Sequence, residues 1–187
     1  VRLRPNLKWT DGSSFTAEDV AFTVNTAFAF ELAYDWSTYY PREYLDHAEA
    51  VDPTTVKFVF KQKPNVSVWQ YGALQGPIAQ KVFWESIVKD AAKLLPTNTL
   101  RMSIDEARIS LATAQSDFEE VSAQVLALKL NGKQNRKLDG DFLRMQGEVT
   151  YSQSNLDKLV EDYATQVKSA QETLYAVTDE KERTLGA

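Results

Sequence analysis

The chain has 187 residues, of which 43% are hydrophobic, and 21 basic and 26 acidic residues give it a formal net charge of −5. This length permits one domain with a sizeable core, or a smaller globular unit with an appendage. The acidic balance disfavours nucleic-acid binding, and the absence of cysteine excludes disulfides, thiolate metal sites and cysteine nucleophiles. No apolar run approaches the length that crosses a bilayer, so no membrane-spanning segment is expected.

The composition changes near residue 90. All four tryptophans and five of the six prolines precede this point, whereas the second half is rich in Ala, Leu, Gln, Glu and Lys. This change predicts an α+β protein in which a small mixed α/β lobe, residues 1–92, is followed by a helical region, residues 93–187.

The first elements of the lobe are short. Residues 1–4 and 7–9 have the pattern of strand pieces, and Asp11-Gly12 is a turn signal. The segment 16–19 resembles a capping box, and apolar residues then recur every four positions at Val20, Val24 and Phe28. We therefore expect a helix that begins near residue 17 and packs one face on a sheet.

A β-hairpin is expected next. Residues 44–51 and 55–61 have strand character and are joined by the turn Asp52-Pro53-Thr54, with large apolar residues at every second position of the second strand. The apolar stretch 66–74 follows, and residues 78–90 have the character of a short helix.

The second half predicts two long helices. A capping box at residue 103 precedes an apolar stripe with alternating steps of three and four residues, and Asn131-Gly132 supplies a stop, so the first helix is expected at 103–130. A second stripe predicts a helix at 142–178. Joined by a polar connection, the two helices most simply form a long antiparallel hairpin in which each covers the other's stripe. The plain alternative is an insertion that packs only on itself, and the basic run of Lys133, Arg136 and Lys137 is expected to lie in a solvated loop.

The N-terminal half carries ordered motifs of a known family. A strand ending in Trp9 precedes Asp11-Gly12 and the helix start Thr16-Ala17-Glu18-Asp19-Val20, and the segments 51–60 and 76–84 follow at similar spacing. This series resembles family 5 of the solute-binding proteins, the oligopeptide, dipeptide and nickel carriers of ABC importers. The resemblance covers about 85 residues and departs after Trp84, where a long helical segment intervenes.

The resemblance implies that this chain is a fragment that contains the accessory lobe of a peptide-type carrier. It implies extracytoplasmic location, either periplasmic or anchored at the cell surface, and lobes that close on the ligand outside this segment. The implied partners are a peptide or other small solute and the ABC permease subunits. An alternative function is a protein–protein interaction module that acts through the helical hairpin.

No catalytic residue, metal site or cofactor is expected. The single histidine, His47, is interpreted as a surface residue, because strand alternation is expected to separate it from Asp46 and leave only Glu49 beside it. No acid–base pair, phosphate loop or nucleophile motif occurs, so an enzyme is not predicted.

An aromatic cluster gives the candidate ligand-binding residues Tyr34, Trp36, Tyr39 and Tyr40. Aromatic side chains combine a large apolar area with a polar tip, which suits peptide side chains of varied chemistry. The alternative is that these residues only pack the loop against the lobe.

Overall fold

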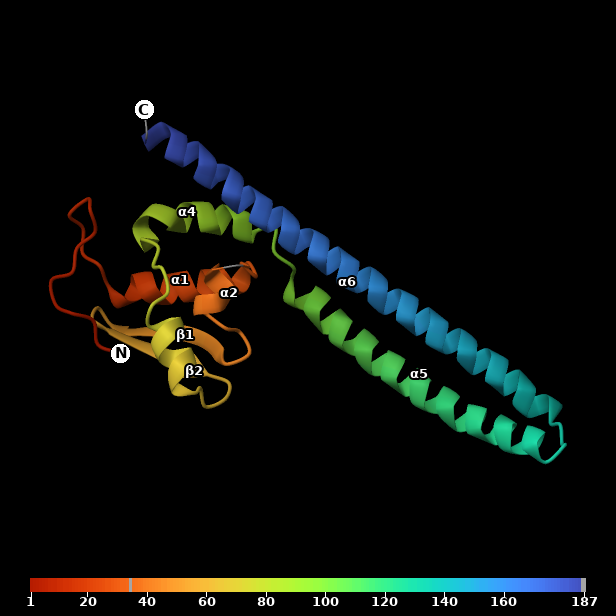
Figure 1. The fold of residues 1–187 in the computed structure, drawn as a ribbon. Helices are drawn as coiled ribbons and strands as arrows, with labels where there is room; N and C mark the ends of the chain where they lie inside the picture. Colours follow the sequence, from red (N-terminus) through yellow and green to blue (C-terminus); the bar gives the residue numbers. More distant parts are fainter. Residues whose placement is uncertain (34, 186–187) are drawn as a thin grey trace. The chain divides into compact units, whose positions relative to one another are not determined.

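The computed structural model describes residues 1–33 and 35–185 (Figure 1). The chain forms two compact units, which we call the lobe and the hairpin unit. The lobe comprises Val1–Leu95 together with Val167–Ala187, and the hairpin unit comprises Pro96–Gln166. The combination of a two-stranded sheet with long helices confirms the predicted α+β class. The predicted division into two domains stays a prediction, because compact units need not fold independently.

Helix α1, Ala17–Ala29, begins at the predicted capping box. The backbone amide of Thr16 donates to the carboxylate of Asp19 at 2.8 Å, and the side chain of Thr16 faces the backbone of residue 19 in return. The buried face of the helix carries Val20, Val24 and Ala27. The capped start and two of the three repeat positions, Val20 and Val24, therefore occur where the sequence indicated.

The β-hairpin also forms where it was expected. Strands β1, Leu45–Asp52, and β2, Thr55–Phe60, pair in antiparallel fashion, with register irregularities at both ends of β1. The predicted strand pieces before α1 are reduced to isolated bridges, Arg2 to Thr55 and Lys8 to Ser14. Because Val1 and Val56 exchange hydrogen bonds, the start of the chain lies along the outer side of β2.

The outer side of β1 is closed by a side chain. Asn25 on α1 donates from its amide nitrogen to the carbonyl of Ala48 at 2.9 Å and accepts from the Ala48 amide at 3.0 Å. The carboxamide thus takes the place that a neighbouring strand would have, and it fixes α1 against the sheet.

Short helices complete the first part of the lobe. Helix α2 spans Asp35–Tyr39, and helix α4 spans Lys81–Ala92. Between them, the apolar stretch after the sheet forms helix α3 (Val66–Val68) and the π-helix η1 (Trp69–Ala73). The ring of Trp69 packs edge-on against Phe58 and Phe60 at centroid distances of 5.2 and 5.4 Å. This contact covers the aromatic face of β2.

The last part of helix α6, Arg136–Leu185, belongs to the lobe. Ala170 and Leu174 are buried in the same core as Phe30 and Val24. The amide nitrogen of Gln171 donates to the Phe30 and Glu31 carbonyls at 2.7 and 3.2 Å, which satisfies carbonyl groups at the end of α1. A segment about 140 residues away in sequence therefore completes the lobe.

The hairpin unit contains α5, Asn98–Leu130, and the first part of α6. The buried residues of α5 follow the predicted stripe from Ile104 to Val125, and Phe118 packs on Phe142 of α6 with a centroid distance of 5.1 Å. Helix α5 ends as predicted, because Gly132 adopts φ +64° and Lys133 donates its amide to the Leu128 carbonyl. The antiparallel helical hairpin is confirmed.

Three details of the predicted helices are wrong. Helix α5 begins at Asn98, capped by Thr97, and not at residue 103. Helix α6 begins at Arg136 and runs through Gly140 and Gly147, because packing of its apolar stripe outweighs the helix cost of about 1 kcal/mol for each glycine. The second stripe is covered by α5 only up to residue 166, and its last part is buried in the lobe.

No helix among the described residues is both long enough and apolar enough to span a membrane.

Candidate functional site

The four aromatic residues chosen from the sequence have different environments. Tyr34 lies outside the described residues. Trp36 and Tyr39 are half-buried in α2, and Tyr40 directly follows this helix with only 1% of its surface exposed. The rings of Trp36 and Tyr40 stack at a centroid distance of 6.5 Å, so these two residues lie together.

Tyr40 packs the lobe. Its hydroxyl donates to the carbonyl of Pro77 at 2.9 Å, and burial raises the pKa of this phenol well above its usual range. A Cβ atom at Gly76 would come within 2.4 Å of the ring, so the turn at 76–77 needs glycine at this position. The packing alternative accounts for this contact, and a role of Tyr40 in ligand binding stays a prediction.

Trp36 lines an apolar cavity within the lobe, which we call the Trp36 pocket. Its volume is about 160 Å³, close to cavities that hold a benzene-sized molecule. Helices α1, α4 and α6 supply most of its walls. The lining residues are Phe22, Thr23, Thr26, Ala27, Leu32, Trp36, Ala79, Trp84, Val88, Leu174 and Tyr175. The size and apolar walls suit a branched aliphatic or aromatic group.

One polar group of this pocket, the hydroxyl of Thr23, is occupied by the surrounding backbone. The hydroxyl of Thr23 donates to the carbonyl of Asp19 at 2.7 Å and accepts from the amide of Ala79 at 2.9 Å. Thr23 thereby ties α1 to the segment before α4. A ligand in the Trp36 pocket would be held by shape and apolar contact more than by hydrogen bonds.

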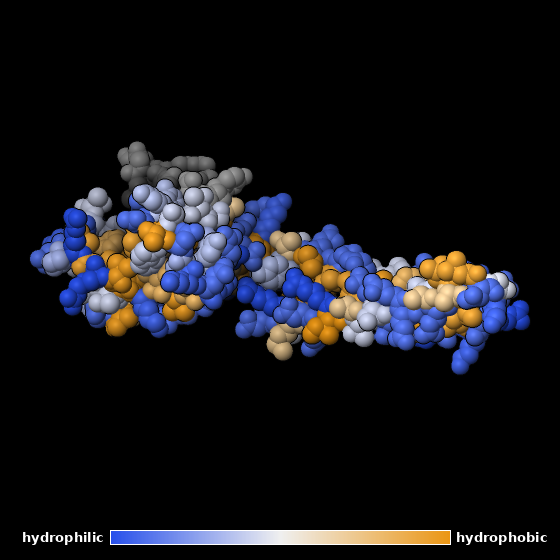
Figure 2. Space-filling view, turned by 60° about the horizontal axis from the view of Figure 1, so that its bottom comes forward, coloured by the Kyte–Doolittle hydropathy of each residue, from blue (hydrophilic) through white to orange (hydrophobic). Residues whose placement is uncertain are grey.

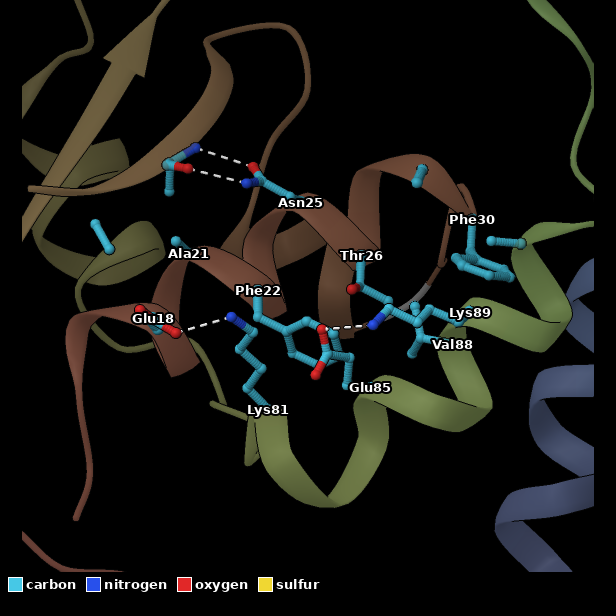
Figure 3. Close-up of a pocket in the computed structure, with 14 residues that line it drawn as sticks. Glu18, Ala21, Phe22, Asn25, Thr26, Phe30, Lys81, Glu85, Val88 and Lys89 are labelled. Carbon is cyan, nitrogen blue, oxygen red and sulfur yellow. Dashed lines mark hydrogen bonds and ion pairs between the residues drawn. The ribbon is translucent and has the colours of Figure 1, made fainter.

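A second hollow, the charged groove, runs along α1, α4 and β1 with a volume of about 530 Å³ (Figure 3). Lys81 pairs with Glu18 at 2.8 Å and Lys89 pairs with Glu85 at 3.0 Å. The hydrogen bond that Lys81 donates to Glu18 raises the pKa of Lys81, and the one that Lys89 donates to Glu85 lowers the pKa of Glu85. Each carboxylate of this groove is paired with a lysine, and the pKa of Glu85 is lowered, which is opposite to the shift that a general acid needs.

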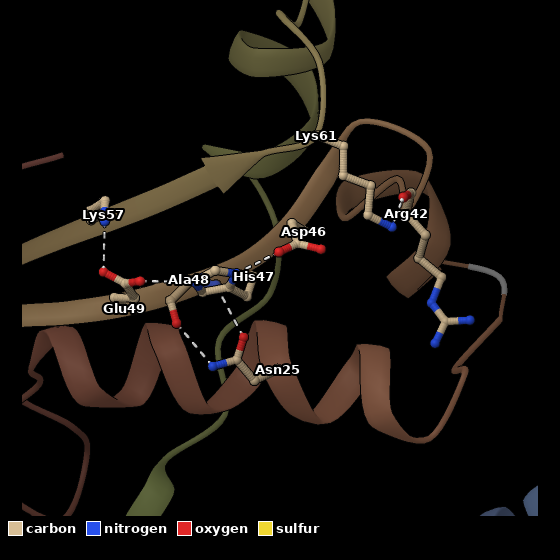
Figure 4. A network of polar contacts seen from close by, with 8 residues as sticks. All are labelled: Asn25, Arg42, Asp46, His47, Ala48, Glu49, Lys57 and Lys61. Carbon is tan, nitrogen blue, oxygen red and sulfur yellow. Dashed lines mark hydrogen bonds and ion pairs between the residues drawn. The ribbon is translucent and has the colours of Figure 1, made fainter. Parts of the chain in front are cut away.

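His47 departs from its expected surroundings (Figure 4). Its two ring nitrogens lie 2.8 Å from carboxylate oxygens, Nδ1 from Asp46 and Nε2 from Glu49. The expectation that Asp46 faces away was wrong, because a register shift between Leu45 and His47 interrupts the alternation of β1. Hydrogen bonds to Glu49 and then Asp46 raise the pKa of His47.

Among the described residues, no group of three or more His, Asp or Glu side chains could hold a metal ion.

The Trp-x-Asp-Gly motif at 9–12 and the Thr-Ala-x-Asp-Val motif at 16–20 meet at one buried carboxylate, that of Asp19. Asp19 accepts hydrogen bonds from the Thr16 amide and from the Trp9 indole, the latter at 3.3 Å. It also accepts one at 2.8 Å from the amide of Lys81, the first residue of α4. Asp11 accepts from Gln80 and Ser13, and these bonds lower its pKa to about 2. The motif residues therefore join α1 to α4 and position the helices that line the Trp36 pocket.

Comparison with known protein families agrees with this arrangement. A family model described as bacterial extracellular solute-binding proteins, family 5 middle, matches residues 1–102, which is more than half of the chain. The chain belongs to family 5 of the bacterial extracellular solute-binding proteins. No curated protein and no solved structure matches it.

Family 5 solute-binding proteins serve ABC importers, are typically extracytoplasmic and are not enzymes. The family 5 match includes most walls of the Trp36 pocket and ends near the start of α5. Leu174 and Tyr175 lie outside the matched residues, yet they close one side of this pocket.

Sequence reasoning identified Trp36 but missed most of its neighbours in this family 5 lobe. Phe22, Trp84 and Val88 lie on helix faces whose apolar spacing could have indicated them. Leu174 belonged to the recognised second stripe, but sequence alone assigned that stripe to the other long helix.

Proposed function

We propose that this chain is part of a peptide-type carrier that captures a peptide or other small solute outside the cytoplasm and delivers it to ABC permease subunits. The observation that carries this proposal is the Trp36 pocket, an apolar cavity in the family 5 lobe. In this role the pocket receives an apolar side chain of the solute, with Trp36 as its principal contact. Tyr34, Tyr39 and Tyr40 are proposed as neighbouring contacts.

The proposed mechanism is binding without chemistry. An apolar group entering a cavity of about 160 Å³ gains burial without displacing the hydrogen bonds of Thr23. Carriers of this kind work by differential affinity between open and closed arrangements, so the pocket contributes selectivity and the closing lobes contribute retention.

The test is to equilibrate the chain with a peptide mixture, remove unbound peptide and identify what is retained by mass spectrometry. We expect retained peptides to be enriched in Leu, Ile or Phe, and a ligand present at about 100 times its Kd to stabilise the fold by about 2.7 kcal/mol. Trp36→Ala should abolish both effects. Tyr71→Ala changes an aromatic residue that is 67% exposed and does not line the pocket, so it should leave them intact. Absence of any retained peptide and of any thermal shift would contradict the proposal.

A second candidate is an interaction module in which the hairpin unit contacts a protein partner. It is favoured by large apolar residues that α5 and α6 leave in solvent, including Met102, Ile109 and Tyr151, which are 63, 68 and 76% exposed. Replacing residues 97–166 with a glycine–serine linker separates the candidates. If solute retention and uptake are unchanged but a partner is lost, the hairpin unit is an interaction module.

A further inference from the structure

Four cationic side chains gather at the tip of the hairpin unit. They are Lys129 in the last turn of α5, Lys133 in the connection, and Arg136 and Lys137 at the start of α6, and all four are exposed. No acidic residue occurs in the sequence between Glu120 and Asp139. Among the described residues, no carboxylate forms an ion pair with any of these four.

Exposed leucines lie beside these cations. Leu126 and Leu130 are 58 and 79% exposed, and their spacing of four residues places them on the same face of α5. Each is directed away from the stripe that contains the buried residue Val125. In Figure 2 the hairpin unit, on the right, shows orange apolar surface near its tip beside blue hydrophilic surface.

Helix α6 adds a third leucine to this face. Leu143 is 67% exposed and follows Phe142, the stripe residue that packs on Phe118, just as Leu126 follows Val125. In two antiparallel right-handed helices, the positions that directly follow stripe residues project from the same side of the pair. Leu126, Leu130 and Leu143 therefore share one side of the hairpin unit.

The nearby carboxylates do not cancel this cationic character. Asp141 lies 3.6 Å from Arg144, which also pairs with Glu148 at 2.7 Å. Asp139 stands in the first turn of α6, where a negative charge favours the helix dipole. The four cations of the tip remain in excess.

We propose that the tip of the hairpin unit, residues 126–143, docks on an anionic lipid bilayer. The three leucines enter the boundary between headgroups and acyl chains, and Lys129, Lys133, Arg136 and Lys137 contact anionic headgroups. Clustered basic residues beside exposed apolar ones are the combination that binds such surfaces. A lipid surface is favoured over a protein partner, because unpaired cations beside exposed leucines match a layer of anionic headgroups above an apolar interior.

The test is co-sedimentation of the full chain with vesicles of phosphatidylcholine, with and without phosphatidylglycerol. We expect binding only when phosphatidylglycerol is present, and weaker binding at high salt. The triple variant Lys133→Gln, Arg136→Gln and Lys137→Gln should bind about 100-fold more weakly, because each cation near an anionic surface contributes roughly fivefold. Equal binding of both vesicle types, or of the triple variant and the unmodified chain, would overturn the proposal.

Matched apolar variants distinguish vesicle binding through the tip from nonspecific hydrophobic binding elsewhere on the hairpin unit. Leu126→Ser with Leu130→Ser should weaken vesicle binding at least tenfold, whereas Met102→Ser with Ile109→Ser alters leucine-sized exposed residues far from the tip and should not. All four side chains are exposed, so these variants should keep the helical circular dichroism of the parent chain. The opposite ranking of the two double variants would contradict docking through the tip.

The absence of cysteine allows a direct probe of insertion. A polarity-sensitive fluorophore on Leu130→Cys should shift to the blue with phosphatidylglycerol vesicles, and the same label on Ile109→Cys should not. Binding to poly-glutamate without binding to vesicles would also overturn the proposal and would point to an acidic protein partner.

Discussion

The lobe and the hairpin unit of this family 5 protein are stabilised in different ways. The lobe buries Phe30, Tyr40 and Leu45 almost completely, and its core joins segments from both ends of the chain. The hairpin unit buries a narrow stripe of smaller residues between two helices, and its most buried members keep about 6 to 9% exposure. Lobe stability therefore depends on contacts between distant residues, whereas the hairpin depends on a repeated pattern within two neighbouring helices.

The largest effect that should sharpen this comparison involves two leucines of the same helix. Leu174 is buried in the lobe core and lines the Trp36 pocket, so Leu174→Ala should lower the free energy of unfolding by about 2–5 kcal/mol. Leu143→Ala, at a 67% exposed position of the hairpin unit, should change it by no more than about 0.5 kcal/mol. Urea denaturation measures both. Similar losses for the two variants would show that the end of α6 does not pack in the lobe.

An intermediate effect on stability is expected from a glycine-to-alanine substitution made once in the lobe and once in the hairpin unit. Gly76→Ala would place a methyl group 2.4 Å from the ring of Tyr40, and such overpacking costs about 1–3 kcal/mol. Gly140→Ala has open space around it within helix α6, so it should stabilise the hairpin unit by about 0.5–1 kcal/mol. Thermal denaturation should therefore move the two variants in opposite directions. Stabilisation by Gly76→Ala would disprove the close approach of Tyr40.

The smallest expected effect is a pH dependence of the melting temperature that arises from His47 in the lobe. Hydrogen bonds to Glu49 and then to Asp46 raise the folded-state pKa of His47 above its ordinary value of about 6.5. The stabilisation should be fully present below that ordinary value and be lost as the pH rises through the folded pKa. His47→Gln should remove this slope from the melting temperature, and as the only histidine it leaves no other imidazole to confuse the result. An unchanged slope in the variant would exclude His47 as its source.

Much of the local structure could be predicted because neighbouring residues determine it. The capping box at Thr16, the hairpin turn at Asp52 and the stop at Gly132 act within a few residues, and each occurs where the sequence indicated. The family resemblance was confirmed for the same reason, because its motifs are turn and cap residues in a fixed order.

The remaining features depend on distant partners. The apolar stripe that contains Leu174 would have the same sequence whether it packed on α5 or in the lobe. The length of α5 decides how much of this stripe α5 can cover. The contact of His47 with Asp46 requires a register irregularity that alternation alone does not reveal. The Trp36 pocket combines residues from four helices, so its candidate residues could be only partly named from one aromatic cluster.

Helix α6 belongs partly to the hairpin unit and partly to the lobe, which has a practical consequence for dividing the chain into fragments. A protease cut in the connection 131–135 would produce two fragments, and the second would still hold Gln171 and Leu174 in place against the first. Fragments expressed separately should then reassemble into the native form. The chain thus offers a natural split point, at which reporter halves could be attached without disturbing the core of the lobe.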